Sequence, residues 1–224
     1  MPNRETPLSL GLLLASLIAG LSFWIGKDMA LPLALKMGWK GAGVGLLALY
    51  ALSHAHSREG YRIALVMALG ALGDVLLELN FQAGAAAFLL GHVAAMDLYL
   101  RHRRESTTGS QKALAVALLL GTPAIAWLLP GDRAMALPVA VYALVLGGMA
   151  GAAWTSSFPR YRVGTGAVLF VASDLLIFAR MGPLAGSALP GLLIWPFYYF
   201  GQLLICVGVT GRLRENSASQ PTQQ

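Results

Sequence analysis

The chain has 224 residues, of which 57% are hydrophobic and only 12% are charged, and its mean hydropathy is +0.65. A soluble domain carries roughly twice that charged fraction, and stretches of about twenty mainly apolar residues recur along the whole length, each long enough to cross a bilayer. The composition therefore excludes a soluble domain and indicates an all-α integral membrane protein. The net charge of +6 does not indicate nucleic-acid binding, because the basic residues lie in short loops between apolar segments.

Eight apolar segments predict a polytopic membrane bundle of about eight transmembrane helices. In chain order their expected limits are residues 8–26, 30–55, 61–79, 83–101, 112–130, 134–155, 161–180 and 188–211. The first resembles a signal sequence, but it is longer than a typical apolar signal region and lacks a convincing cleavage site, so we expect a retained span. The second is the least clear, because Lys36 and Lys40 interrupt its first half.

The remaining residues suggest no separate soluble domain. We expect a single transmembrane domain over residues 1–211, followed by a polar tail over residues 212–224 that lacks aromatics and is expected to be disordered. Of the 16 Lys and Arg residues, only Lys27, Lys36, Lys40, Arg133 and Arg180 fall on the side opposite the two termini. Because cytoplasmic loops carry the excess of Lys and Arg, both termini are predicted to be cytoplasmic in a multi-pass protein of the cell membrane.

Several polar residues lie inside these apolar segments, where a carboxylate costs several kcal/mol or more unless it is paired, neutralised or faces a wet cavity. They are Asp74, His92, Asp174, Tyr199 and Gln202. With the predicted topology, Asp74 and Asp174 both lie roughly 8–9 Å inside the non-cytoplasmic end of their spans. Lys40 approaches from the same side. Polar residues without a shared role would scatter in depth, so we predict one functional site within that half of the membrane.

The individual residues have plainer interpretations as well. Asp74 is a candidate for a buried ion pair with Lys40 that holds two helices in register. Glu78 shares a helical face with Asp74, but it lies close to the interface and is expected to be a solvated helix end. Asp97 either lines the cavity or pairs with Arg101 four residues on.

His92 is the only histidine expected at depth, and its plainer interpretation is a hydrogen-bonded packing residue. A three-histidine zinc site is therefore not expected, and Cys206, the single cysteine, excludes a disulfide within the chain or a cysteine-based metal cluster. The Gly-Asp at Asp74 also resembles an element of intramembrane aspartyl proteases. We reject that interpretation, because the first glycine of the element is missing and Ser173 precedes the second aspartate where a tyrosine is expected.

From about Lys40 to Gln202 the chain resembles the YhhN family, the multi-span lysoplasmalogenase-type membrane proteins. Each matching motif is weak alone, but their order and their placement on the helices are specific. The matching residues are Gly73 and Asp74; Phe88, Gly91 and His92; Gly166, Ala167, Phe170, Ser173 and Asp174; and Tyr198, Tyr199 and Gln202. The chain departs from the family at Gly41, where a proline usually follows the lysine, and at Ala95, where a tyrosine is usual and Tyr99 is the nearest substitute.

The resemblance implies a membrane-embedded hydrolase that cleaves the vinyl-ether bond of lysoplasmalogens into a fatty aldehyde and a glycerophospho-alcohol. Asp74 and Asp174 would be the acid and the stabilising carboxylate, in an order left open, and His92 would tune a carboxyl or relay protons. The substrate-binding residues would be Lys40, Ser173, Tyr198, Tyr199 and Gln202. The partners expected are the lysolipid and membrane lipids, with no metal, no organic cofactor and no obligatory protein partner.

A different class of function uses the same carboxylates. In a small-molecule or lipid carrier, Asp74 and Asp174 would form a proton relay or a ligand site. The sequence shows no inverted pair of interrupted helices, which a transporter would favour. Hydrolysis is therefore the leading interpretation.

Overall fold

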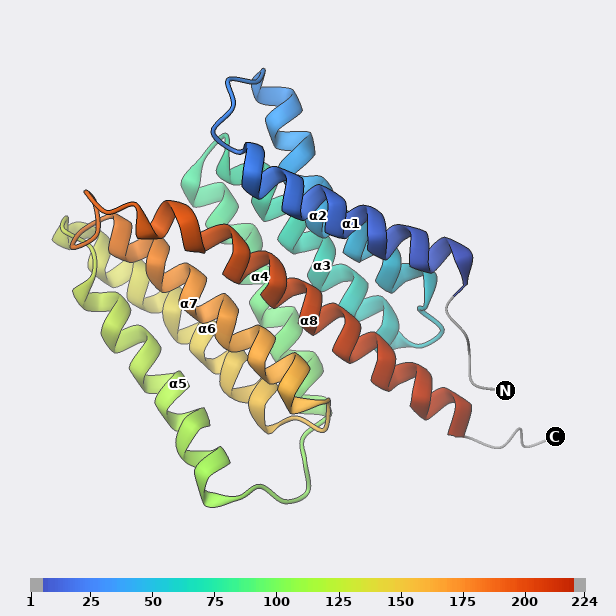
Figure 1. Ribbon diagram of the computed structural model, residues 1–224. Helices are drawn as coiled ribbons and strands as arrows, with labels where there is room; N and C mark the ends of the chain where they lie inside the picture. Colours follow the sequence, from blue (N-terminus) through green and yellow to red (C-terminus); the bar gives the residue numbers. More distant parts are fainter. Residues whose placement is uncertain (1–5, 220–224) are drawn as a thin grey trace. The chain divides into compact units, whose positions relative to one another are not determined.

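The computed structural model describes residues 6–219, and these residues form eight α-helices (Figure 1). In chain order the helices are α1 (Pro7–Gly26), α2 (Leu33–Ser53), α3 (Arg58–Leu77), α4 (Phe81–Arg101), α5 (Gly109–Leu128), α6 (Ala136–Thr155), α7 (Thr165–Arg180) and α8 (Leu189–Ser219). A 3₁₀ turn precedes α6 and a π-helical turn precedes α7. Over the described residues the only β-type pairing is an isolated bridge between Arg103 and Ser156. The predicted all-α architecture is confirmed.

Hydroxyl and amide side chains define the starts of several helices. The Thr6 side chain accepts a hydrogen bond from the backbone N–H of Ser9 at the start of α1, and Ser57 does the same for Gly60 in α3. Thr108 and Gln111 form a reciprocal capping box at α5. Each bond satisfies a backbone donor that the first helical turn leaves unpaired. These caps explain why the helices begin up to three residues before the apolar segments.

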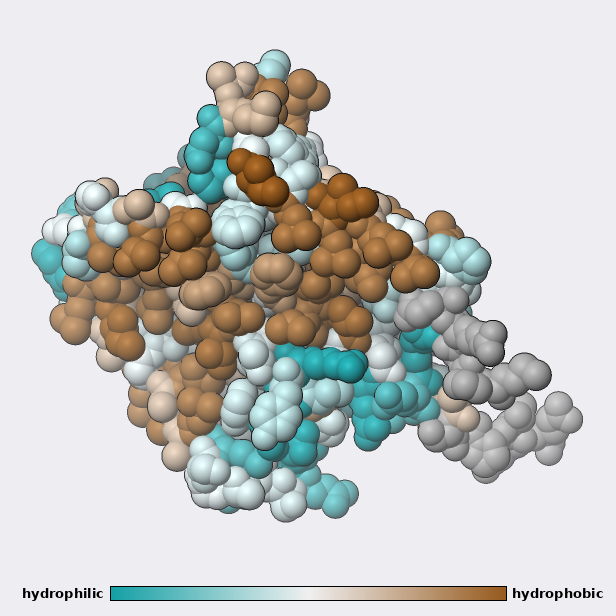
Figure 2. Space-filling model, in the orientation of Figure 1, coloured by the Kyte–Doolittle hydropathy of each residue, from teal (hydrophilic) through white to brown (hydrophobic). Residues whose placement is uncertain are grey.

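Seven of the eight helices are long and apolar enough to cross a membrane. The exception is α2, which carries Lys36 and Lys40 in its first half, as the sequence suggested for this segment. Large apolar side chains lie exposed along the outer helices, and on the face shown in Figure 2 they gather over α1. Exposed apolar surface of this extent suits contact with lipid chains.

The predicted disordered tail begins inside α8. That helix continues to Ser219, eight residues into the predicted tail, and residues 220–224 lie outside the described part of the chain. Two local interactions extend the helix beyond the apolar segment. Arg212 pairs with Glu215 one turn on, and the Ser217 hydroxyl donates to the carbonyl of Leu213.

The helices group into two compact units. Unit 1 consists of the residues up to Ala94 together with those from Cys206 onward, and unit 2 is Ala95–Ile205. In unit 1, α1 packs on α2 and α2 packs on α3. In unit 2, α6 packs against α5 and α7. The site residues predicted from the sequence are therefore divided between the units, and each unit is described separately below.

The helix pair α7–α8 of unit 2 depends on two glycines. A Cβ atom placed on Gly166 would lie 2.6 Å from the carbonyl oxygen of Gly201, and one placed on Gly201 would lie 2.7 Å from the carbonyl oxygen of Gly166. The backbones therefore approach so closely that neither position accepts a side chain without movement. This contact holds the Ser-Asp motif of α7 beside the aromatic segment of α8.

Gly166→Ala is expected to destabilise the protein. The added methyl group meets rigid backbone, and overpacking of this kind costs about 1–3 kcal/mol. Gly121→Ala in α5 is the matched control, because a Cβ there meets no atom within 4 Å and alanine is the better helix former. Thermal unfolding of the purified protein in detergent should show a lower melting temperature for Gly166→Ala and an unchanged or higher one for Gly121→Ala. Equal melting temperatures for the two variants would refute the close-packing explanation.

Candidate functional site

Asp74 lies in the last turn of α3 in unit 1, where only 2% of its surface is exposed. The residue before it explains how α4 covers this turn. A Cβ atom on Gly73 would lie 2.7 Å from the Phe88 ring, so only glycine lets that ring rest on α3. The Gly-Asp motif of α3 and Phe88 of α4 therefore pack directly against each other, at the helix turn where Asp74 is buried.

His92 lies one turn beyond Phe88 on the same face of α4 and is also buried. Gly73 faces Phe88, while Gly91 faces Leu69, so the two helices run antiparallel in register. This pairing places His92 level with about Leu69, five residues or about 7.5 Å along the helix pair from Asp74. Two of the three predicted catalytic residues thus lie on neighbouring helices of unit 1.

Lys40 pairs with Glu78. Its Nζ atom lies 2.7 Å from Glu78 Oε1, and Lys36 Nζ lies 3.7 Å from Oε2 of the same carboxylate. Gly41 makes this possible, because a larger residue there would meet the Val75 side chain and separate α2 from α3. The structure therefore corrects the interpretation of Glu78 as a solvated helix end, since it is the direct partner of Lys40.

The charges of Lys36 and Lys40, which with Glu78 form the α2–α3 cluster, favour the ionised form of Glu78. Partial burial alone would raise the pKa of Glu78, but the hydrogen bond and the charge of Lys40, with a contribution from Lys36, hold its pKa below the usual range. Glu78 is therefore an anion at neutral pH, and it lies one turn after the buried Asp74 on α3.

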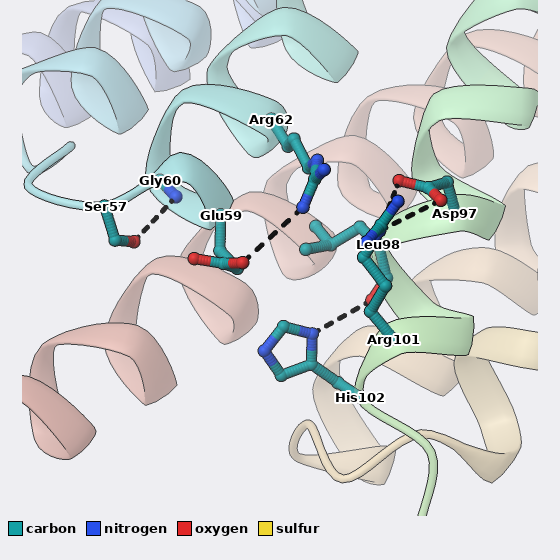
Figure 3. Close-up of polar contacts among 8 residues, drawn as sticks. All are labelled: Ser57, Glu59, Gly60, Arg62, Asp97, Leu98, Arg101 and His102. Atoms are coloured by element: carbon teal, nitrogen blue, oxygen red, sulfur yellow. Dashed lines mark hydrogen bonds and ion pairs between the residues drawn. The ribbon is translucent and has the colours of Figure 1, made fainter.

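Asp97 pairs with Arg101 on the surface of α4. Both of its carboxylate oxygens accept from Arg101 Nε, at 3.0 and 2.9 Å (Figure 3), and both side chains are exposed. Of the two interpretations left open by the sequence, the ion pair is confirmed. Glu59 and Arg62 form a similar surface pair on α3, and His102 Nδ1 contacts the carbonyl of Leu98 at the end of α4 (Figure 3).

Asp174 lies in α7 of unit 2 and is buried, with 5% of its surface exposed. The hydroxyl of Tyr142, from α6, donates a hydrogen bond of 2.7 Å to Asp174 Oδ2. The Tyr142 ring packs edge-on against Phe178, one turn after Asp174, with the ring centroids 5.9 Å apart. The sequence analysis missed Tyr142. A tyrosine in the middle of an apolar span was the available signal, because a buried phenol needs a hydrogen-bond partner.

The aromatic motif of α8 forms a packed group beside Asp174 in unit 2. Trp195 stacks on Tyr199 with an interplanar angle of 12°, and the Tyr198 ring meets Phe170 of α7 edge-on at 5.1 Å. Gln202 is buried three residues after Tyr199. The predicted binding residues of α8 are therefore interior side chains that follow one another along a single helix.

Ser173 connects α7 to α8. Its hydroxyl donates a hydrogen bond of 3.0 Å to the carbonyl of Ile194, two residues before Pro196. Ser173 thus positions the start of the aromatic segment, and its role in binding substrate stays a prediction.

Unit 1 contains Asp74 and His92 on the neighbouring helices α3 and α4, and the Glu78 partner of Lys36 and Lys40 lies one turn after Asp74. Unit 2 brings together Ser173, Asp174, Tyr198, Tyr199 and Gln202 and adds Tyr142. The convergence of both groups on one site stays a prediction. Among the described residues, no group of three or more His, Cys, Asp or Glu side chains is arranged to hold a metal ion.

The described residues form eight helices, seven of them able to span a bilayer, and define a multi-pass membrane protein. The buried carboxylates inside these spans make up its candidate functional site. The chain belongs to the YhhN family, whose sequence model matches residues 35–209. The matched region begins in α2 and ends in α8, so it contains every candidate site residue named above.

The chain is also similar to two proteins named Lysoplasmalogenase, one from Mycobacterium bovis (strain ATCC BAA-935 / AF2122/97) and one from Mycobacterium tuberculosis (strain CDC 1551 / Oshkosh). Each is 30% identical to it over 207 residues, which cover 88% of this chain and 79% of the relative. No solved structure matches the chain significantly.

Tyr142→Phe is expected to destabilise the protein through Asp174. Phenylalanine keeps the ring contact with Phe178 and removes only the hydroxyl, so the buried carboxyl loses a donor at a cost of about 1–3 kcal/mol. A double-mutant cycle with Asp174→Ala, measured by unfolding in detergent, should give a coupling energy of about that size. A coupling energy near zero would contradict the hydrogen bond as a stabilising contact.

The stability of unit 1 is expected to depend on pH through Glu78. Because the folded-state pKa of Glu78 is lowered, its ion pairs stabilise the protein fully above the ordinary glutamate pKa. The stabilisation is lost as the pH falls through the folded-state value. Melting temperatures measured between about pH 6 and pH 3 should fall less for Glu78→Gln than for the parent protein. Parallel curves for the two proteins would show that other groups cause the acid loss.

Proposed function

We propose that this protein is a membrane-embedded lysoplasmalogenase that hydrolyses the vinyl-ether bond of lysoplasmalogen-type lysolipids. The observation that carries the proposal is a buried aspartate in an apolar helix of each unit, Asp74 in α3 and Asp174 in α7. The membership of the YhhN family and the similarity to proteins named Lysoplasmalogenase support the same reaction. The protein would act in the cell membrane, which is the inner membrane in a bacterium with two.

The chemistry of the bond calls for two carboxyl groups in different protonation states. One carboxylic acid donates its proton to the alkenyl carbon distant from the ether oxygen, and the remaining carbon becomes an oxocarbenium ion. An ionised carboxylate stabilises that cation and accepts a proton from the attacking water. The resulting hemiacetal collapses to the aldehyde as the glycerol oxygen regains a proton. In sum the reaction consumes one water molecule.

The surroundings of the two aspartates suit these roles. Both side chains are shielded from bulk water, and a carboxyl in a low-dielectric site can remain protonated at neutral pH and act as an acid. Asp174 accepts a hydrogen bond from Tyr142, an arrangement that stabilises the ionised form of a carboxylate. We therefore propose that Asp74 and Asp174 share the roles of proton donor and stabilising carboxylate, in an order that the two Asn variants described below can distinguish.

The remaining site residues have supporting roles in the proposal. His92, about 7.5 Å from Asp74 along the α3–α4 pair, would relay a proton to that carboxyl through water or another polar group. Tyr199 and Gln202 would orient water or the ether oxygen, while the apolar helix surfaces accept the alkenyl chain. Tyr198 and Ser173 hold the segment of α8 that carries these groups. No step of this mechanism requires a metal or an organic cofactor.

The test is the release of fatty aldehyde from lysoplasmalogen by the purified protein in detergent. Asp74→Asn and Asp174→Asn should each lower kcat by at least about 100-fold, the usual contribution of a general acid or base. Asp97→Asn is the matched control, because this exposed aspartate lies in a helix-surface ion pair and its loss should leave kcat unchanged. Circular dichroism and melting temperatures establish that each variant is folded.

Each alternative outcome has a definite meaning. A folded parent protein that releases no aldehyde refutes the lysoplasmalogenase proposal. Full activity in either aspartate variant refutes the catalytic role of that residue.

A further inference from the structure

Two lysines of α2 share one carboxylate of α3, and their charges do not cancel. Lys40 forms a short hydrogen bond to Glu78, and Lys36 lies 3.7 Å from the other carboxylate oxygen. Two ammonium groups against one carboxylate leave one net positive charge at this end of the helix pair. We propose that Lys36 and Lys40, the two lysines that share the Glu78 carboxylate, form the subsite that binds the phosphate of a single-chain phospholipid. The assignment to the substrate rests on the function proposed above.

Within the pair, Lys36 is the lysine available to a ligand. At 3.7 Å its contact with Glu78 is outside hydrogen-bonding range, so its three N–H donors remain available to an oxygen acceptor. Its side chain is 34% exposed, whereas that of Lys40 is 13% exposed. Lys40 therefore supplies a fixed charge and Lys36 supplies the hydrogen bonds, which is a suitable division for recognising a phosphate.

The distance from Asp74 fits the substrate. Glu78 follows Asp74 by four residues, so the two carboxyls share one face of α3, about 6 Å apart along the helix axis. In a lysoplasmalogen only the glycerol backbone separates the ether oxygen from the phosphate, a length comparable with that separation. A lipid whose phosphate meets the lysine pair would therefore have its vinyl ether at the depth of Asp74.

A purely structural ion pair does not explain the second lysine. One lysine suffices to neutralise Glu78, and a partly exposed pair stabilises a protein only slightly. A second ammonium group adds repulsion between the lysines unless a further anion is present. Lys27, in the loop before α2, forms its own pair with Asp28 at 2.6 Å. Within α2 and the loop before it, the excess positive charge therefore lies at Lys36 and Lys40, on the side where Lys and Arg are predicted to be scarce.

The test measures binding without hydrolysis. The purified protein in phospholipid-free detergent is titrated with saturated 1-alkyl-glycerophosphoethanolamine, which has no vinyl ether to cleave, and with 1-alkylglycerol, which lacks the phosphate. Lys36→Gln should weaken binding of the phospholipid about tenfold and leave binding of 1-alkylglycerol unchanged. Lys27→Gln is the matched control and should change neither affinity, because that lysine lies outside the cluster.

Glu78→Gln separates ligand binding from a structural role. Removal of the carboxylate raises the net positive charge, so the variant should bind the phospholipid at least as tightly as the parent protein does. A structural ion pair predicts the opposite, namely that Glu78→Gln and Lys36→Gln weaken the affinity for both ligands together. That outcome overturns the proposal, as does an unchanged phospholipid affinity in Lys36→Gln. Melting temperatures of all variants are measured alongside.

Two further arms identify the source of the phosphate. Soluble glycerol 3-phosphate should compete only weakly, and competition as strong as that of the lysolipid would overturn the assignment to a lipid head group. Aldehyde release is assayed separately with the vinyl-ether substrate. A parent protein that binds the saturated lipid through Lys36 and releases no aldehyde would refute the proposed hydrolase and leave the phosphate subsite supported.

Discussion

The cost of a carboxyl group inside an apolar helix bundle is the constraint on which the rest of this structure depends. A buried carboxyl requires hydrogen-bond donors or nearby positive charge, and it requires shielding that is built by its neighbours. Asp174 obtains a donor from Tyr142 on the adjacent helix. Asp74 is enclosed where Phe88 lies on Gly73. In both units, therefore, residues on a second helix determine the environment of the acid.

Close helix approach at glycines provides these environments. Gly41 brings α2 to α3 so that Lys40 meets Glu78, Gly73 admits the Phe88 ring, and Gly166 meets Gly201 where α7 crosses α8. Side chains at these positions would separate the helix pairs that hold the polar groups. Helix packing in membranes relies on such contacts, because lipid offers no hydrophobic drive for association. The positions of these glycines therefore determine which polar side chains can meet across each helix pair.

The sequence predicted the parts of this structure that depend on local composition. The eight helices follow from apolar segments separated by polar loops, and the pair of Asp97 with Arg101 follows from their spacing on α4. It did not predict contacts between helices. Asp74 and Glu78 lie one turn apart on α3, so spacing alone cannot decide which of them meets Lys40. Tyr142 was missed for a similar reason, since nothing in α6 indicates that its hydroxyl reaches α7.

The pairing of Lys40 with Glu78 gives the two carboxyl groups of α3, Asp74 and Glu78, different surroundings. A lysine on Asp74 would have held that carboxyl ionised and unsuited to donating a proton. Lys40 instead meets Glu78, which is partly exposed, and with Lys36 holds the Glu78 pKa low. One helix thus carries two acids with different surroundings, an ionised one at its end and a buried one a turn earlier. The proposed phosphate subsite follows from this single contact.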